Sequence, residues 1–302
     1  MSCLFPIPMH RDSSGNVCSS KYSHTQFYVP CGQCGECRLS RARSWATRCV
    51  HEASQWKLNS FITLTYRTPP AGNSLDPQDT RNFIRKLRYH LDTPFKYFLV
   101  GEYGDNFDRP HYHALIFGYD FGLTNHRNPT EKQKTSDLNF LHNTSALDCP
   151  ELNNLWGLGY TSVGELTFDS AAYCAQYAMK KINGPMAEKH YQGRHPEFMR
   201  TSQNAIGKQY ASNFSKEIIL NNSVISNGTE QPIPNYYLKL YEKQNLDLTN
   251  LKQQREEFSQ THSIEKSYIR ACMLDSKFKL KASKSDAFRI KYAKEAFFSL
   301  PT

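Results

Sequence analysis

Two apolar segments on either side of one short polar segment constrain the fold of this chain most strongly. "FKYFLVGEYG" covers residues 95–104, "HYHALIFG" covers residues 111–118, and "DNFDRP" is most of what separates them. Two runs rich in aromatic and β-branched residues on either side of a short turn predict an antiparallel β-hairpin. "NSFITLTY" at residues 59–66 and "GYTSVGELTF" at residues 159–168 predict two further strands.

Helical patterns occupy the segments around these strands. One covers residues 36–56, and another starts at Asp76-Pro77 and runs to about Leu91. "DSAAYCAQYAMKK" at residues 169–181 predicts a third helix, with Asp169 or Ser170 as its N-cap. The order β-α-β-β, then β-α, predicts an α+β fold in which a mostly antiparallel sheet carries its helices on one face.

The same reading predicts three parts along the chain. Residues 1–58 form an N-terminal segment with a cysteine cluster and a basic helix, residues 59–235 contain the sheet, and residues 236–302 form a helical, basic extension. No stretch approaches the ~20 apolar residues that a membrane span requires, and the mean hydropathy is −0.65. The N-terminus lacks the pattern of a secretory signal, so we expect a protein of the cytoplasm.

Two histidines begin the third predicted strand. Alternate strand residues face the same side, so His111 and His113 project together while Tyr112 faces the other way. Two neutral imidazoles on one face can bind one cation. Glu102, across the hairpin from His111, is well placed as a third ligand. The alternative is a pair of partly buried histidines that hydrogen-bond the backbone or each other, and this triplet alone does not decide between the two.

Two tyrosines lie four residues apart in the predicted helix at 169–181. Tyr173 and Tyr177 therefore share one face, and Lys180 continues it. Tyrosine can act as a covalent nucleophile, although forming its phenolate at pH 7 costs about 4 kcal/mol. A nearby lysine or divalent metal ion would offset much of that cost, and a phosphodiester polarised by the ion is a suitable electrophile. The alternative is an aromatic pair packed into the core.

A cysteine cluster precedes the basic helix. "CGQCGEC" places Cys31, Cys34 and Cys37 at two-residue gaps, a spacing that suits structural zinc, which needs four ligands. The fourth ligand would come from one of three other cysteines, Cys3, Cys18 or Cys49. The alternative is a group of reduced, partly exposed thiols.

The positive charge of the chain favours a nucleic-acid partner. The net charge is +9 and the isoelectric point is about 9.0, a balance that attracts phosphate backbones, although a solvated basic surface gives the same numbers. The helix after the cysteines carries four arginines that could contact DNA phosphates, namely Arg38, Arg41, Arg43 and Arg48. Lysines and arginines are also frequent at residues 265–295.

Three segments in this order carry a resemblance to a known family. "FITLTY", "RPHYHALIFG" and "YCAQYAMKK" resemble the three motifs of the two-tyrosine HUH endonucleases, which initiate rolling-circle replication. "PCGQCGECRLSRARSWATRC", "GEYGDNFDRPHYHALIFG" and "PIPNYYLKLYEK" are similar to the replication initiators of the gokushovirus branch of the microviruses, which are small single-stranded DNA phages. The similarity runs from about residue 30 to residue 245.

The resemblance implies a fold, a metal and a reaction. It implies an antiparallel-sheet palm with flanking helices, and Mg²⁺ or Mn²⁺ held by a histidine pair on a central strand. By matching position, His111 and His113 would be ligands, Tyr173 and Tyr177 nucleophiles, and Lys180 a helper. The reaction would be nicking of single-stranded origin DNA, which leaves a 5′-phosphotyrosine and a 3′-hydroxyl primer, followed by strand transfer that closes the circle.

The resemblance also implies partners and a location. The expected partners are origin DNA and the helicase and polymerase of the bacterial host, in whose cytoplasm the protein would act. The sequence holds no Walker-type phosphate loop, so unwinding must come from elsewhere. Two other functions stay open, a transposase or plasmid relaxase of the same fold and a non-catalytic zinc-knuckle protein that binds single-stranded DNA.

Overall fold

The computed structural model describes most of the chain, namely residues 3, 6–19, 27–104, 107–123, 149–177, 179, 181 and 185–261. Lys180 and the basic segment at 265–295 lie outside these residues, so their predicted roles stay predictions. The chain divides into two compact units, one of residues 42–244 and one that combines residues 1–41 with residues 245–302. No helix within the described ranges is both long and apolar enough to cross a membrane.

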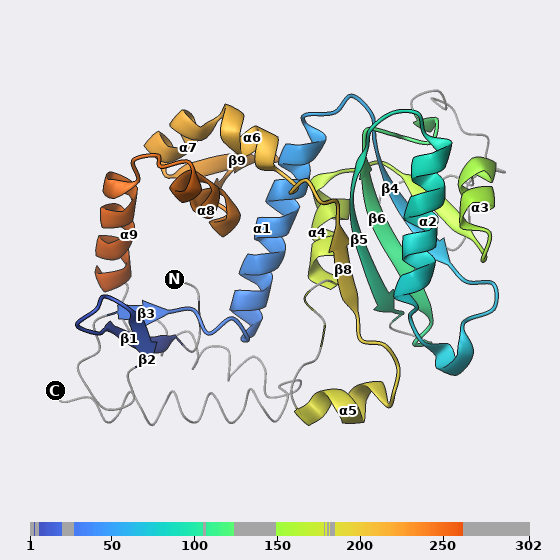
Figure 1. Cartoon of the computed structure of the whole chain (residues 1–302), viewed down its shortest axis with the longest axis horizontal. Helices are drawn as coiled ribbons and strands as arrows, with labels where there is room; N and C mark the ends of the chain where they lie inside the picture. The colour runs from blue at the N-terminus through green and yellow to red at the C-terminus, as the bar shows by residue number, and fades with distance from the viewer. Residues whose placement is uncertain are drawn as a thin grey trace. The chain divides into compact units, whose positions relative to one another are not determined.

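The larger unit contains a five-stranded sheet in which every pair of neighbours is antiparallel (Figure 1). The strands in spatial order are β7 (Thr161–Gly164), β4 (Asn59–Thr65), β6 (Pro110–Phe117), β5 (Lys96–Tyr103) and β8 (Phe198–Thr201). Strands β5 and β6 form the hairpin that the sequence predicts. The α+β fold with an antiparallel sheet is therefore confirmed.

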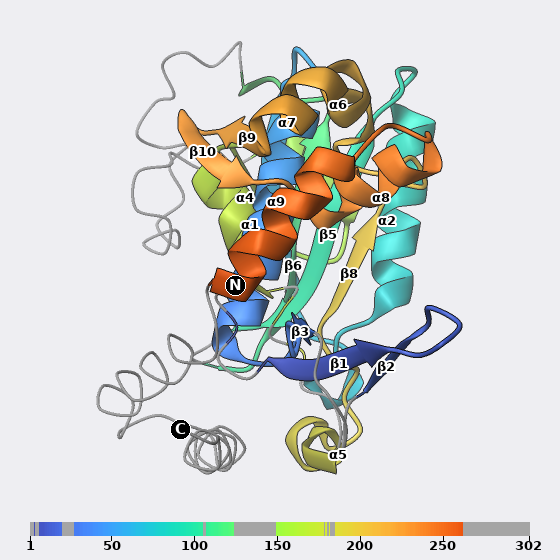
Figure 2. The same ribbon diagram turned by 90° about the vertical axis from the view of Figure 1, so that its left-hand side faces the viewer.

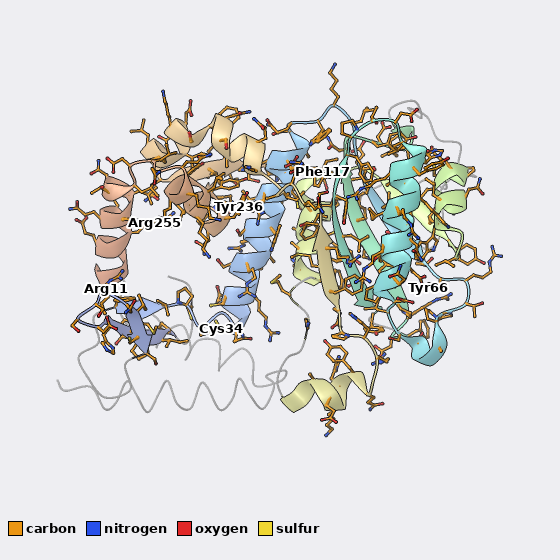
Figure 3. All side chains as sticks on the ribbon, in the orientation of Figure 1. Arg11, Cys34, Tyr66, Phe117, Tyr236 and Arg255 are labelled. Atoms are coloured by element: carbon orange, nitrogen blue, oxygen red, sulfur yellow. The ribbon has the colours of Figure 1, made fainter. Side chains whose placement is uncertain are left out.

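Helices cover both faces of this sheet, so the expectation of helices on one face was wrong. Helices α2 (Pro77–His90) and α3 (Pro150–Trp156) pack against the face that bears Tyr66. Helix α4 (Phe168–Tyr177) and residues from Ala42 onward in α1 (Gly35–Ala53) pack against the face that bears Phe117, and Figure 3 labels both aromatic residues. The physical reason lies in β5 and β6, which are apolar at nearly every position and therefore have to be buried on both sides.

The starts of α2 and α4 illustrate how local side chains set the helix boundaries. Asp76 caps α2 as predicted, because its carboxylate accepts a hydrogen bond from the Gln78 backbone N–H at 2.7 Å. Helix α4 begins one residue earlier than predicted, with Thr167 as the residue before its first turn. The hydroxyl of Thr167 accepts from the Ser170 N–H at 3.2 Å, and the Ser170 hydroxyl accepts from the Thr167 N–H at 2.8 Å. This reciprocal capping pair replaces the predicted cap at Asp169 or Ser170.

The remainder of the larger unit has short elements with weak periodicity. A short 3₁₀ turn at Ala71–Asn73 precedes α2. The other elements are α5 (Pro185–Tyr191), α6 (Lys208–Asn213), α7 (Ser215–Asn221), the antiparallel pair β9 (Ser223–Ser226) and β10 (Thr229–Pro232), and α8 (Asn235–Lys243). His51 of α1 links this region to the rest, because its ring nitrogens hydrogen-bond the Tyr237 hydroxyl and the Ile225 carbonyl, each at 2.9 Å.

The smaller unit contains a three-stranded antiparallel sheet of order β2-β1-β3 (Figure 2). Its strands are β1 (Ile7–Arg11), β2 (Val17–Ser19) and β3 (Phe27–Val29), and α9 (Thr249–Thr261) belongs to the same unit. Among its described residues, the buried apolar side chains are three cysteines and two leucines, namely Cys3, Cys34, Cys37, Leu248 and Leu251. Such a small core gives this unit little hydrophobic stabilisation of its own.

Candidate active site

One row across the central sheet brings together three of the predicted site residues. The register pairs His111 of β6 with Glu102 of β5 on one side and with Thr65 of β4 on the other. His113 lies two residues further along β6, where it pairs with Thr63. Side chains of paired residues face the same side of a sheet. Glu102, His111 and His113 therefore share the face that α4 covers.

The two imidazoles converge on one carboxylate oxygen. The Nε2 atoms of His111 and His113 lie 2.8 and 3.0 Å from Oε1 of Glu102. The carboxylate is 1% exposed, whereas the His111 side chain is 16% exposed. The cluster is therefore closed on the Glu102 side and open to solvent and substrate on the His111 side.

Hydrogen bonds at the far nitrogens orient both rings. Nδ1 of His111 lies 3.0 Å from the Arg109 carbonyl oxygen, to which it can only donate. Nδ1 of His113 lies 3.0 Å from the Thr63 hydroxyl, which can either donate or accept. Both contacts direct the Nε2 atoms toward Glu102. Such contacts at the far nitrogen are typical of histidines that bind metals, because they fix the ring and its tautomer.

The protonation states suit a cation at this place. Burial alone would raise the pKa of Glu102, but hydrogen bonds from His111 and His113 outweigh it and hold that pKa below its ordinary value. Burial lowers the pKa of His113, which favours the neutral imidazole that metals require. Oε2 of Glu102 is buried and has no hydrogen-bond partner among the described residues. A divalent ion bound by an oxygen and two nitrogens fits this cluster, whose ligand atoms lie within 4.8 Å of one another.

The two predicted tyrosines lie directly over this cluster. Their ring centroids are 4.5 Å apart, and the His113 ring lies 5.0 Å from the Tyr173 ring and 6.2 Å from the Tyr177 ring. Burial, and after it the charge of Glu102, raise the pKa of Tyr173 above its ordinary value. This phenol is therefore protonated unless a positive charge or a base is brought close.

The predicted DNA-binding arginines of α1 differ in their surroundings. Arg38, Arg41 and Arg43 are exposed, as contact with phosphates would require. Arg48 is buried, its Nε donates to the Ile206 carbonyl at 3.1 Å, and aromatic rings lie against its guanidinium at 3.9 and 4.2 Å. We therefore assign Arg48 to packing and leave it out of any DNA interface.

The predicted cysteine cluster gains a fourth member in the structure. The sulfur atoms of Cys31, Cys34 and Cys37 lie within 4.8 Å of one another and of the Cys3 sulfur. The three alternatives for a fourth residue are thereby reduced to Cys3, which belongs to the same compact unit as the other three.

Sequence reasoning missed one residue that contributes to the site. Thr63 orients His113, yet a threonine in a strand is ordinary and gives no signal of its own. Its role depends on the strand register, which the sequence does not print. A prediction of β4 pairing directly with β6 would have placed Thr63 beside His113.

Comparisons with known proteins place this fold and site in one class. The sequence model of a family described as "Replication-associated protein", of the ORF2 type, matches residues 59–182, which include both histidines and both tyrosines. No solved structure gives a significant match.

Three curated relatives narrow the class. The chain is 32% identical over 257 residues to the replication-associated protein VP4 of Bdellovibrio phage phiMH2K, covering 80% of this chain and 78% of that protein. It is 29% identical over 225 residues to the replication-associated protein ORF4 of Chlamydia phage 1, covering 72% of this chain and 54% of the relative. It is 29% identical over 290 residues to the replication-associated protein ORF2 of Spiroplasma virus 4, covering 85% and 86%. The chain belongs to the family of phage replication-associated proteins, which confirms its resemblance to the replication proteins of microviruses.

Proposed function

We propose that this protein initiates rolling-circle replication of a phage genome by nicking single-stranded origin DNA. One observation carries the proposal, namely the two phenols of α4 placed over a buried cluster of one carboxylate and two imidazoles. A purely structural aromatic pair has no need for a cation site beneath it. The names of the relatives, all phage replication-associated proteins, support replication over transposition or plasmid transfer.

The chemistry follows from the positions of these groups. Mg²⁺ or Mn²⁺ bound by Glu102, His111 and His113 would neutralise charge on the scissile phosphate. The phenol oxygen of Tyr173 or Tyr177 attacks the phosphorus atom, a phosphotyrosine bond forms, and the bond from phosphorus to the 3′ oxygen breaks. The 3′ oxygen takes up a proton and becomes the hydroxyl that primes synthesis.

Two tyrosines suit a reaction that ends in a closed circle. One phenol holds the 5′ end of the nicked strand while the other cuts the regenerated origin. The new 3′-hydroxyl then attacks the first phosphotyrosine bond, which releases that tyrosine and joins the strand without ATP. The short distance between the rings, 4.5 Å between centroids, keeps both phenols within reach of one bound phosphate.

We propose further that the protein works in the bacterial host cell with single-stranded origin DNA as its substrate and the host helicase and polymerase as partners. Arg38, Arg41 and Arg43 are the arginines of α1 that remain as phosphate contacts, because all three are exposed. Lys180 is proposed as a helper of the phenols on the ground of its sequence position.

The test is formation of a covalent adduct. Labelled oligonucleotides that tile the viral strand are incubated with the full chain in Mn²⁺ or in EDTA, and the products are separated on a denaturing gel. We expect a Mn²⁺-dependent adduct with one group of overlapping oligonucleotides, and mass spectrometry should locate it on Tyr173 or Tyr177.

Matched variants separate the enzyme from a binding protein. The double variant Tyr173→Phe with Tyr177→Phe should form no adduct and keep its DNA affinity, whereas Tyr236→Phe, outside the site, should behave as the wild type. Tight DNA binding without an adduct for any oligonucleotide would refute the nickase and favour a non-catalytic single-stranded DNA-binding protein.

A further inference from the structure

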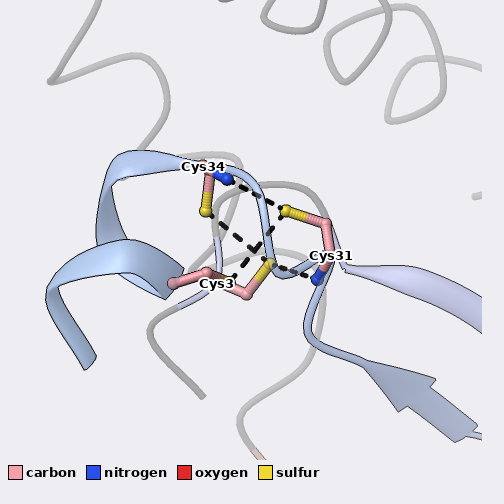
Figure 4. A group of neighbouring side chains, drawn as sticks. Cys3, Cys31 and Cys34 are labelled. Atoms are coloured by element: carbon pink, nitrogen blue, oxygen red, sulfur yellow. Dashed lines mark hydrogen bonds between the residues drawn. The ribbon is translucent and has the colours of Figure 1, made fainter. Parts of the chain in front are cut away.

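Four cysteine side chains in the smaller unit form a closed cluster that the proposed nicking reaction does not use. Sγ of Cys3 lies 4.0 Å from Sγ of Cys34, and Sγ of Cys31 lies 4.0 Å from Sγ of Cys37. Cys3, Cys34 and Cys37 are buried, and Cys31 is half-buried. Figure 4 shows three of these side chains directed toward a common point.

The sulfur separations match those around a single tetrahedral ion. A zinc–sulfur distance of about 2.3 Å places the sulfurs of a regular tetrahedron about 3.8 Å apart. The two measured separations of 4.0 Å are close to this value. An iron–sulfur cluster would insert inorganic sulfides between the thiolates and hold them further apart. A disulfide would need sulfurs at about 2 Å.

The backbone around the cluster is arranged for charged sulfur atoms. The N–H groups of Gln33 and Cys34 donate to the Cys31 sulfur at 3.5 and 3.4 Å, and the Cys31 N–H donates to the Cys3 sulfur at 3.2 Å. Gly32 adopts φ of 72°, which lets the chain turn tightly between Cys31 and Cys34. Hydrogen bonds of this kind are stronger when the acceptor carries a negative charge, as a metal-bound thiolate does.

The other two cysteines considered for a fourth ligand have different surroundings. The Cys18 thiol lies near Asp12 and Asn16 in the turn between β1 and β2. Cys49 is fully buried in the core of the larger unit, beside α4. Neither contributes to the cluster among the described residues.

From these contacts we propose that the smaller unit binds one structural Zn²⁺ through Cys3, Cys31, Cys34 and Cys37. The ion ties the N-terminal residues to the first turn of α1. It supplies the stabilisation that this unit lacks, since its described buried apolar residues are few. Zinc binding displaces a proton from each thiol, so the site carries two net negative charges that the adjacent arginines Arg38 and Arg41 can balance.

The test uses the metal content and the optical spectrum of the purified full chain. We expect one zinc per chain by elemental analysis, with neither iron nor inorganic sulfide. Replacing zinc by Co²⁺ should give thiolate-to-cobalt charge-transfer bands and the ligand-field bands of a tetrahedral ion. Cys3→Ser should lower the charge-transfer intensity by about a quarter, because one of four thiolates is lost, and should weaken metal binding at least tenfold in competition with a chelator.

Two further variants keep the proposal falsifiable. Cys18→Ser is the matched control and should leave the zinc content and the cobalt spectrum unchanged. Cys3→His supplies a different ligand at the same place and should keep one metal while shifting the spectrum, even if Cys3→Ser fails to fold. Zinc-free purified protein, bound iron with sulfide, or a spectrum that changes in Cys18→Ser and not in Cys3→Ser would each overturn the assignment.

A separate observation concerns an exposed aromatic ring in the row of the active site. The Tyr160 carbonyl accepts hydrogen bonds from the backbone N–H of Thr65 at 2.8 Å and from the Thr65 hydroxyl at 2.9 Å. Thr65 pairs with His111, so Tyr160 continues the row that contains His111 and Glu102. The Tyr160 residue is 61% exposed, and the Arg67 guanidinium lies 5.5 Å from the ring centroid.

We infer that Tyr160 and Arg67 form a stacking platform for a base of the strand bound at the nick site. The inference rests on the proposed function, because it takes single-stranded DNA as the substrate. Two strand spacings separate Tyr160 from His111, or about 10 Å, which corresponds to about three stacked nucleotides. An exposed ring supported by a guanidinium is the kind of surface on which unpaired bases stack.

The platform is tested by DNA binding, which does not depend on cleavage. Tyr160→Leu should raise the dissociation constant for a single-stranded oligonucleotide between about 5- and 150-fold, and Tyr160→Phe should restore it. Tyr89→Leu, which changes a ring that is 93% exposed on α2, is the control and should have no effect. A change below twofold in Tyr160→Leu would refute the platform, whereas absence of an adduct in the wild type would refute the nickase alone.

Discussion

Replacing Thr63 by valine tests whether His113 is held as a metal ligand. Valine keeps the shape of threonine and removes the hydroxyl that lies 3.0 Å from Nδ1 of His113. If Nε2 binds the ion, Nδ1 must carry the proton and donate it to Thr63. Loss of such an orienting contact typically weakens metal binding 10- to 100-fold, or about 1.4–2.7 kcal/mol.

The assay is a titration of Mn²⁺ in the adduct reaction. We expect Thr63→Val to raise the Mn²⁺ concentration for half-maximal adduct by that factor and to reach the same yield at saturating metal. Ser162→Ala is the matched control, because Ser162 pairs with Thr63 on the same face and also loses a hydroxyl. An unchanged titration in Thr63→Val, or an equal shift in Ser162→Ala, would refute the reasoning.

Three other predictions concern stability and DNA binding. Arg48→Ala should lower the free energy of unfolding by about 2 kcal/mol or more in a urea titration, because it leaves a buried carbonyl without its donor, and should not change DNA affinity. Arg41→Ala should do the opposite and reduce the slope of log affinity against log salt by about one. Burial lowers the pKa of His51 from its ordinary 6.5, so the unfolded state binds more protons below that pH. The free energy of unfolding should therefore fall between pH 7.5 and pH 5.5, and His51→Gln should reduce this dependence. Gly159→Ala would place Cβ 2.3 Å from the Thr65 carbonyl oxygen, so the melting temperature should fall sharply. An unchanged melting temperature would show that this backbone can move.

Local signals in the sequence were sufficient for the hairpin and for the residues placed on it. Alternation along β6 put His111 and His113 on one face, and the short turn put Glu102 opposite His111; the structure brings all three together. The i, i+4 spacing likewise placed Tyr173 and Tyr177 side by side. Each of these predictions depends on a period or a turn length, which is information within a few residues of chain.

What the sequence could not predict depends on contacts between distant segments. Strand β8 lies in a region with poor periodicity, and only its pairing with β5 makes it a strand of the sheet. The choice of Cys3 over Cys18 depends on how residues 3–31 fold back on themselves, and no local pattern encodes that. Arg48 sits on a helix with exposed arginines, and its burial comes from α8 and from the segment before α6.

The packing of His113 makes the two interpretations of the histidine pair harder to separate than the motif suggests. This imidazole is 5% exposed, stacks on Phe61 with centroids 5.5 Å apart and meets Tyr173 edge-on. A metal ligand and a core histidine would look alike in this respect. Glu102 decides in favour of a metal, because a buried carboxylate with one oxygen lacking a partner among the described residues is costly to the fold. A cation at this place removes that cost, and it also lowers the barrier to forming a phenolate on the adjacent tyrosines.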